Sequence, residues 1–392
     1  MTADIREEPP MQIEPFGVEI WMNAHENDCA INLAETCVSS LTLDELLRLT
    51  GRNADALAEL LPRKLGYGAI EGSDRLRDAI AALYADATRE DVIVAHGTAG
   101  ANALVWQAMV GAGDQVVSLV PTYQQHVSIP ESLGAEVVRF PLRPEENWLP
   151  DTDALARAVT PGTRMVALTN PNNPTGALID RAGLERIVEI ARAAGAWLLV
   201  DEVYRGTAQD DDSIGPSVVD LYERGISTAG MSKAFALAGL RLGWVVGPEE
   251  VRTAVSRHRD YNTISVGLID DHLAALALES ADRVLDRSRR ITRGNLELID
   301  TWIGSEPHLD WVRPRAGTTA LVAYDLDLPS ERFCLDLLAE EGVLFTPGSA
   351  MGMEGHVRIG FANDPAALEA GLPRVSAYLA RHAGERAKLR AG

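Results

Sequence analysis

Residues 164–176 read RMVALTNPNNPTG, and this stretch decides the fold class. Its first six residues form a short apolar run that is typical of a buried strand. Its last seven contain two Asn-Pro steps, which favour an extended turn because proline disfavours helical geometry in the residue before it. A single Asn-Pro step indicates only an irregular turn, but seven residues with this much restriction indicate a rigid loop that holds an amide side chain still.

Similar apolar runs lie on both sides of this stretch and alternate with helical patterns. The alternation predicts an α/β fold, a three-layer sandwich with a mostly parallel central sheet. Ligands of such sheets bind at the carboxyl ends of the strands, so the residues just after each strand are the candidate site. The predicted strands are 91–96, 115–120, 136–140, 164–169, 196–200, 226–229 and 242–247, and the predicted helices are 99–111, 124–133, 151–159, 181–195 and 248–258.

The pattern changes at about residue 267. Two long helices lead into short strands and a charged helix, which predicts a smaller α+β domain at the C-terminus. These elements are expected at 267–281, 283–303, 319–324, 356–361 and 364–385. We therefore expect an N-terminal arm (1–35) that packs with the small domain, a large domain (36–282) and a small C-terminal domain (283–392).

Composition excludes several classes of protein. The 392 residues are 46% hydrophobic and 24% charged, as in average globular proteins. The formal net charge of −21 repels nucleic acid and anionic lipid, so neither is expected as a partner. No apolar stretch is long enough to span a membrane, and the acidic start MTADIREEPPMQ is unlike a secretory signal, so we expect a cytoplasmic protein. The three cysteines and eight histidines show no ligand spacing, and no metal site is expected.

Two further strand ends carry reactive side chains. DEVY at 201–204 follows one predicted strand, and GMSK at 230–233 follows the next. A carboxylate at a strand end is often only a helix cap, and a lone lysine is usually solvated. Lys233, however, precedes the apolar run AFALA, where burial would lower the pKa of its ammonium group. An amine with a lowered pKa is a nucleophile suited to Schiff-base chemistry.

The order of these motifs resembles the class I/II aminotransferase family. NPNNPTG at 170–176 is followed by DEVY at 201–204, SK at 232–233 and GLRLGW at 239–244, and the resemblance runs from about residue 60 to about 362. It implies a fold-type I enzyme, similar to aspartate aminotransferase, with pyridoxal 5'-phosphate (PLP) as cofactor. It also implies a ping-pong reaction in which an α-amino acid gives its nitrogen to a 2-oxo acid.

The resemblance implies roles for the residues around the cofactor ring. Lys233 would form the Schiff base and move the Cα proton, and Asp201 would pair with the protonated ring nitrogen. Asn173 and Tyr204 would donate hydrogen bonds to the phenolic oxygen of the ring. Tyr123 would stack on the face of the ring.

The cofactor's phosphate has its own expected set of residues. Thr98 and Ala99 at a helix start would offer backbone N–H groups, and Ser232 and Arg241 would complete the cradle. The sequence departs from the family at Ala99, where Ser or Thr is usual. It departs again at Gly230, where a hydroxyl residue is usual, so one phosphate contact is expected to be missing.

The resemblance also implies how the substrate is bound. Arg358 would bind the substrate's α-carboxylate, with Asn173 beside it. Thr36 and Glu35 stand where the family commonly has a glycine close to that carboxylate, so they are expected to reshape the substrate pocket. Tyr67 matches a tyrosine that reaches the neighbouring subunit's phosphate, which implies a homodimer.

Two alternatives remain open. The departure at Thr36 and Glu35 is compatible with another reaction of the same cofactor in specialised metabolism: oxidation, decarboxylation, β-elimination or cyclisation, including reactions of an arginine derivative. A non-catalytic ligand sensor of this fold would need a basic DNA-binding domain of about 70 residues, and only about 35 residues precede the motifs. His96 and His126 lie near the cofactor segments; His126 is the better candidate for a pocket residue, although surface positions are the simplest interpretation of both.

Overall fold

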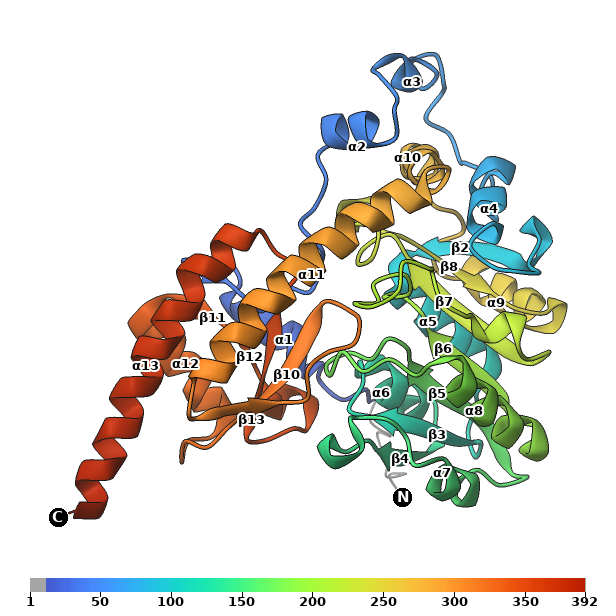
Figure 1. The fold of residues 1–392 in the computed structure, drawn as a ribbon. Coiled ribbons are helices and arrows are strands. Elements are labelled where there is room, and N and C mark those ends of the chain that lie inside the picture. Colours follow the sequence, from blue (N-terminus) through green and yellow to red (C-terminus); the bar gives the residue numbers. More distant parts are fainter. Residues whose placement is uncertain (1–11, 392) are drawn as a thin grey trace, which may run out of the picture.

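A computed structural model describes residues 12–391 of the protein (Figure 1). Its larger part is built on a seven-stranded sheet with the order β2-β8-β7-β6-β5-β3-β4. Strand β8 is antiparallel to both of its neighbours, and the other pairs are parallel. This confirms the predicted, mostly parallel sheet. The strands are β2 (Val92–His96), β3 (Gln115–Val120), β4 (Glu136–Pro141), β5 (Thr163–Thr169), β6 (Trp197–Asp201), β7 (Gly225–Gly230) and β8 (Leu242–Val246).

Helices cover both faces of this sheet. Val166 and Leu198 pack on one face with α7 and α8, and their chain neighbours Met165 and Leu199 pack on the other with α5 and α9. Because successive residues of a strand point to opposite faces, both faces are apolar and the sheet is the middle of three layers. The helices are α5 (Gly97–Met109), α6 (Gln125–Ser132), α7 (Thr152–Ala158), α8 (Arg181–Ala194) and α9 (Glu249–Asp260).

A smaller α+β part follows, as predicted. Its antiparallel sheet has the order β12-β13-β10-β9 and shares a core with α11, α12 and α13. Helix α11 runs without a break from the large part into the small one (Figure 1) and crosses the predicted boundary at 282/283, which remains a prediction. The elements are β9 (Leu309–Trp311), β10 (Thr319–Tyr324), β12 (Thr346–Pro347), β13 (His356–Gly360), α11 (Ala281–Ser305), α12 (Ser330–Glu341) and α13 (Pro365–Ala391).

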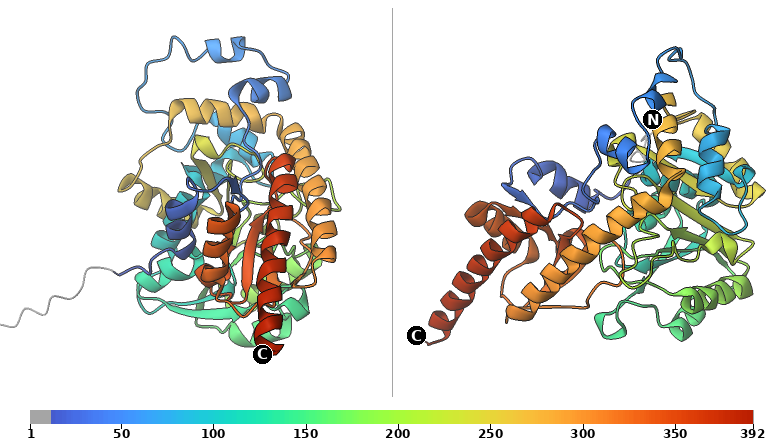
Figure 2. Two further views of the ribbon diagram at one scale, coloured as in Figure 1. Left: turned by 90° about the vertical axis from the view of Figure 1, so that its left-hand side faces the viewer. Right: turned by 45° about the horizontal axis from the view of Figure 1, so that its top comes forward.

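The N-terminal segment lies against this small part (Figure 2). Helix α1 (Gly17–His25) contacts β12 and the short helix η5 (Gly348–Met351), and β1 (Ile31–Asn32) pairs with β11 (Val343–Leu344). The indole Nε1 of Trp21 donates a hydrogen bond to the carbonyl of Phe345 at 2.8 Å. Residues 1–11 of the predicted arm lie outside the described residues.

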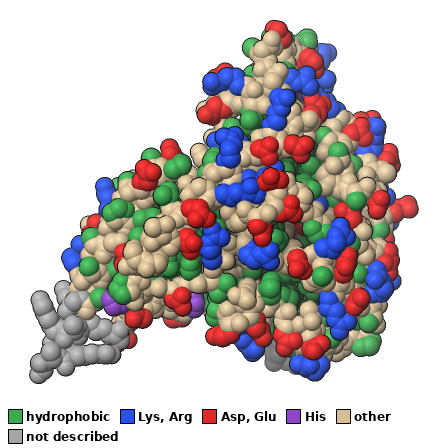
Figure 3. Space-filling model, viewed as in Figure 1, with side chains coloured by type: hydrophobic (Ala, Val, Ile, Leu, Met, Phe, Trp, Pro, Cys, Tyr) green, Lys and Arg blue, Asp and Glu red, His purple; other side chains and the backbone are tan. Residues whose placement is uncertain are grey.

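A long excursion protrudes from the large part at the top of Figure 1. It contains α2 (Leu43–Leu49), α3 (Asp55–Ala58) and α4 (Asp74–Ala81), and α10 (Leu268–Leu278) packs against α4. Acidic and basic side chains are interspersed over the face shown in Figure 3. Within residues 12–391, no helix has the length and apolar character needed to cross a bilayer.

Candidate functional site

The carboxyl ends of the parallel strands surround a cavity of about 290 Å³. The small part closes it from the opposite side through β13, and the N-terminal segment contributes α1 and the residues after β1. This position was predicted from the sequence, because parallel strands end at the same edge of their sheet. All but one of the predicted site residues line the cavity: Glu35, Thr36, Thr98, Ala99, Tyr123, Asn173, Asp201, Tyr204, Ser232, Lys233, Arg241 and Arg358.

Tyr67 is the exception among the predicted site residues. Its side chain is 81% exposed on the protruding excursion and does not line the cavity of its own chain. Its expected contact is with a second subunit, which the structure does not contain, so this role remains a prediction.

Asp201 ends β6 and is held in place by buried neighbours. Its Oδ2 accepts a hydrogen bond from Asn102 Nδ2 at 2.8 Å, and its Oδ1 accepts one from the Val203 N–H at 3.1 Å. Thr228 in turn donates to Asn102 Oδ1 at 2.6 Å. These contacts fix a carboxylate that is only 3% exposed at the wall of the cavity.

His126 lies beside this carboxylate and is fully buried, so the surface position expected from the sequence is wrong. Its Nε2 is 3.5 Å from Asp201 Oδ2, and neither ring nitrogen has a hydrogen-bond partner among the described residues. Asn102 was also missed. Asn102 follows Thr98 by four residues, about one turn of α5, so the two side chains lie on the same side of the helix. This spacing could have identified Asn102 from the sequence.

The three asparagines of NPNNPTG divide into two kinds. Asn170 exchanges hydrogen bonds with the backbone of Ile179, and Asn172 bonds to Pro121 and Thr175, so both side chains fix the loop. The amide of Asn173 instead lines the cavity, where its Oδ1 accepts a hydrogen bond from Arg358 at 3.4 Å. The loop therefore does present one restrained amide to the site.

Lys233 reaches across the cavity to the N-terminal segment. Its Nζ donates to Thr36 Oγ1 at 2.5 Å and to Cys37 Sγ at 3.3 Å. Burial opposes the charge, but Cys37, Tyr204 and Glu35 outweigh it and raise the pKa of Lys233 above its ordinary value. The predicted lowering of this pKa is therefore wrong for the cofactor-free chain. Ala234, Phe235 and Leu237 after Lys233 pack into a separate core rather than around its amine.

The start of α5 forms one end of the cavity. Thr98 and Ala99 are in its first turn, where backbone N–H groups are free of intrahelical partners. Arg241 and Ser232 line the same end of the cavity, and Arg241 Nη1 donates a hydrogen bond to Ser232 Oγ at 3.4 Å. Within the described chain, Thr98 Oγ1 is buried without a hydrogen-bond partner. The position of this hydroxyl also explains why residue 230 is a glycine, because a Cβ there would lie 2.5 Å from Thr98 Oγ1.

Arg358 comes from β13 and forms the opposite end of the cavity. It is 3% exposed, and burial lowers the pKa of its guanidinium group. Its Nη2 donates to Thr346 Oγ1 at 3.2 Å, whereas its Nε has no partner in the part of the chain that the structure describes. A buried guanidinium with donors to spare is suited to bind a carboxylate.

Helix α1 covers this end of the cavity and was not predicted from the sequence. Three residues of the helix and one in the turn after it line the cavity: Val18, Glu19 and Met22, and then Glu26. Glu19 Oε1 accepts a hydrogen bond from the Tyr123 hydroxyl at 3.0 Å. Burial, followed by the charge of Glu19, raises the pKa of Tyr123. The spacing of these four residues follows one face of a helix, which is the signal that could have identified them.

Glu35 points its carboxylate at its own backbone. Its Oε1 accepts hydrogen bonds from the N–H groups of Thr36 and Cys37, each at 2.7 Å. Burial opposes its ionisation, but Lys233 and these hydrogen bonds lower the pKa of Glu35 overall. The carboxylate is thus a fixed anion beside Lys233.

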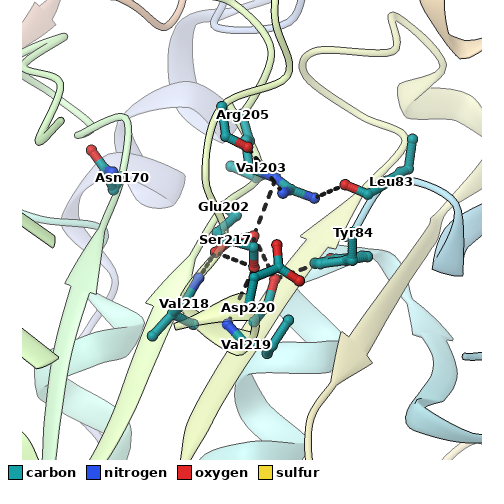
Figure 4. Close-up of polar contacts among 12 residues, drawn as sticks. Leu83, Tyr84, Asn170, Glu202, Val203, Arg205, Ser217, Val218, Val219 and Asp220 are labelled. Atoms are coloured by element: carbon teal, nitrogen blue, oxygen red, sulfur yellow. Dashed lines mark hydrogen bonds and ion pairs between the residues drawn. The ribbon is translucent and has the colours of Figure 1, made fainter. Parts of the chain in front are cut away.

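A second buried network surrounds Glu202, the residue after Asp201 (Figure 4). Glu202 accepts hydrogen bonds from Ser217 Oγ at 2.8 Å, from the Val218 N–H at 2.9 Å and from Ser227 Oγ at 2.8 Å. It also pairs with Arg205 Nε at 3.2 Å. Burial raises the pKa of Glu202, and the arginine and the hydrogen bonds offset part of that rise.

Comparison with known proteins identifies relatives over nearly the whole chain. The profile of the family "Aminotransferase class I and II" matches residues 36–375. Capreomycidine synthase of Streptomyces vinaceus is 31% identical over 95% of this chain and 96% of its own. A solved PLP-dependent aminotransferase from Streptococcus suis is 42% identical, with a TM-score of 0.92 over 95% of this chain and 99% of that one. The solved PLP-dependent cyclase OrfR is 29% identical, with a TM-score of 0.88 over 96% and 99%.

Proposed function

The chain belongs to the aminotransferase class I and II family, and we propose that it transfers the amino group of an α-amino acid to a 2-oxo acid by a ping-pong reaction with PLP as cofactor. The observation that carries this proposal is the cavity itself. It brings the Lys233 amine, the buried Asp201 carboxylate and the Arg358 guanidinium together from three elements that span 157 positions of the chain.

The residues of the cavity fit this cofactor. At one end, the buried and unpartnered Thr98 hydroxyl, the start of α5 and Arg241 are suited to a phosphate group. At the wall, Asp201 is a desolvated carboxylate suited to a protonated ring nitrogen. Asn173 and Tyr204 line the same cavity, where they would bind the phenolic oxygen.

The bound cofactor supplies a carbonyl group that reacts with amines and a ring that withdraws electrons from the substrate's Cα. Lys233 would hold the cofactor through its Nζ and, once replaced by the substrate's amine, would carry the Cα proton on that atom. Arg358 would bind the α-carboxylate with its planar fork and fix the substrate's orientation. The walls formed by α1 and β13 would limit the access of water.

The test is to incubate the purified PLP-loaded protein with a panel of α-amino acids, with and without a 2-oxo acid. Transamination is expected to give a new amino acid only when the 2-oxo acid is present. Lys233→Ala is expected to lose both turnover and the visible absorbance of the lysine-bound cofactor. Turnover that needs no acceptor, or that survives in Lys233→Ala, would exclude this function.

A second candidate reaction is a cyclisation or another acceptor-independent reaction of an arginine derivative. The likeness to the cyclase OrfR supports it. Within this chain, the carboxylates of Glu19, Glu26 and Glu35 all line the cavity, and carboxylates suit a cationic substrate side chain. Arginine analogues are then expected to compete with the substrate, and the product is expected to form without a 2-oxo acid. Absence of both effects would remove this candidate.

We also propose that the enzyme is a homodimer in which Tyr67 completes the site of the partner subunit. The excursion that carries it exposes large apolar side chains, with Leu61 86%, Leu65 82% and Tyr67 81% exposed. Such exposure is unusual for a free surface and typical of an interface. The measurement is the molar mass in solution by light scattering, and a monomer that retains full activity would contradict the proposal.

A further inference from the structure

We propose that residues 35–37 form a docking site for the free amine of Lys233, with Thr36 as the positioning residue. The inference rests on the proposed function only in treating Lys233 as the residue that binds the cofactor. The docking itself belongs to the cofactor-free chain and can be measured there. It concerns the state in which Lys233 is detached and carries a proton.

The contact is short and specific. Lys233 Nζ donates to Thr36 Oγ1 at 2.5 Å and to Cys37 Sγ at 3.3 Å. Thr36 is only 9% exposed, so its hydroxyl acts away from competing bulk water. A hydrogen bond from a charged donor in such surroundings is stronger than one between neutral groups.

The docking segment is held rigidly on the small part. Glu35 accepts the N–H groups of Thr36 and Cys37, and Thr318 Oγ1 donates to the Thr36 carbonyl at 2.6 Å. Gly360 of β13 allows the close approach, because a Cβ at that position would lie 1.8 Å from the Glu35 carbonyl oxygen. The Thr36 hydroxyl therefore has a fixed position to which the amine can return.

The groups around the amine favour its protonated form. Glu35 and Cys37 face Lys233 from the N-terminal segment, and Tyr204 faces it from the turn after β6. The Asp201 carboxylate lines the same cavity, as do the opposing guanidinium groups of Arg241 and Arg358. Thr36 adds an oxygen acceptor, which an ammonium group uses and a neutral amine uses less well. Loss of this acceptor should make the amine easier to deprotonate and more mobile.

The test measures the reactivity of Lys233 in the cofactor-free protein. The probe is trace acetic anhydride, which acylates only neutral amines, and mass spectrometry reports the acetylation of Lys233 relative to the exposed Lys64 in the same sample. Thr36→Val keeps the shape of the side chain but removes the acceptor, and it is expected to increase relative acetylation near neutral pH by about tenfold. Thr36→Ser keeps the hydroxyl and is expected to match the unchanged protein.

The two variants also differ in the loaded enzyme. Thr36→Val is expected to change kcat more than KM, because the hydroxyl acts on the detached amine rather than on the substrate. Circular dichroism and PLP uptake test whether each variant is folded. If Thr36→Val does not fold, Thr36→Ala takes its place in the experiment. Equal acetylation of Lys233 in all folded variants would overturn the docking proposal. Normal docking without any amino transfer would instead reject the proposed function and leave the docking intact.

Discussion

The buried pair of Glu202 and Arg205 gives the sharpest stability prediction. Glu202→Gln keeps the size of the side chain but removes the charge that faces Arg205 at 3.2 Å. The two side chains are 2% and 7% exposed, so water cannot replace the lost partner. The guanidinium group would remain buried and uncompensated.

The expected loss follows from what Arg205 retains. Removal of one partner of a buried ion pair costs about 3–5 kcal/mol of the free energy of unfolding. Arg205 keeps a hydrogen bond to the Leu83 carbonyl at 3.0 Å and lies over the ring of Tyr84 at 4.4 Å. These contacts place the expected loss at the lower end, about 3 kcal/mol.

The assay is urea unfolding at fixed protein and cofactor concentrations, followed by tryptophan fluorescence. A double-mutant cycle with Arg205→Leu and the combined variant isolates the pair from other effects. The combined variant is expected to be more stable than Glu202→Gln, because it leaves no unpaired charge in the interior. A loss below about 1 kcal/mol in Glu202→Gln, or strictly additive losses in the cycle, would refute the argument that the pair is buried and coupled.

Three further predictions concern the site and its surroundings. Arg358→Lys replaces a planar fork with a point charge and is expected to raise KM for the amino acid about 10- to 100-fold, measured by steady-state kinetics; an unchanged KM would contradict its role as carboxylate ligand. Arg241→Leu is expected to weaken PLP binding by a similar factor, which equilibrium dialysis would measure, with equal affinity as the contrary result. Burial raises the pKa of Tyr84 to about 12 from its ordinary 10.0. Its contribution to stability is therefore complete below pH 10 and is lost as the pH rises to 12, by up to about 3 kcal/mol. Tyr84→Phe should flatten this alkaline decline in urea midpoints, and an identical slope would argue against a buried hydroxyl.

Much of the large part could be predicted from the sequence because its strands are continuous apolar runs. Observed β3 (Gln115–Val120) agrees with its prediction, and β5 (Thr163–Thr169) begins one residue earlier. The short strands β11 (Val343–Leu344) and β12 (Thr346–Pro347) could not be found in this way. They have two residues each and exist through pairing with distant segments, which local periodicity does not report.

The site residues that could be predicted are likewise those whose position depends on the local sequence. Asp201 ends a strand, and Asn173 and Lys233 lie three or four residues after one, so all three are positioned at the edge of the sheet. The reversed pKa shift of Lys233 could not be predicted, since the groups responsible include Cys37, 196 positions earlier in the chain. Glu19 was missed for the same reason, because its partner Tyr123 is 104 positions away.

The hydrogen bond from Trp21 to Phe345 has a consequence for how the chain is made. The two residues are 324 positions apart, yet the bond joins α1 to the link between β11 and β12 in the small part. At a synthesis rate of roughly 5–20 residues per second, the indole leaves the ribosome roughly 15–65 s before its acceptor exists. Throughout that interval α1 can contact the large part, through Glu19 and Tyr123, but not the small part. Its position between the two parts is therefore completed only when translation is nearly finished.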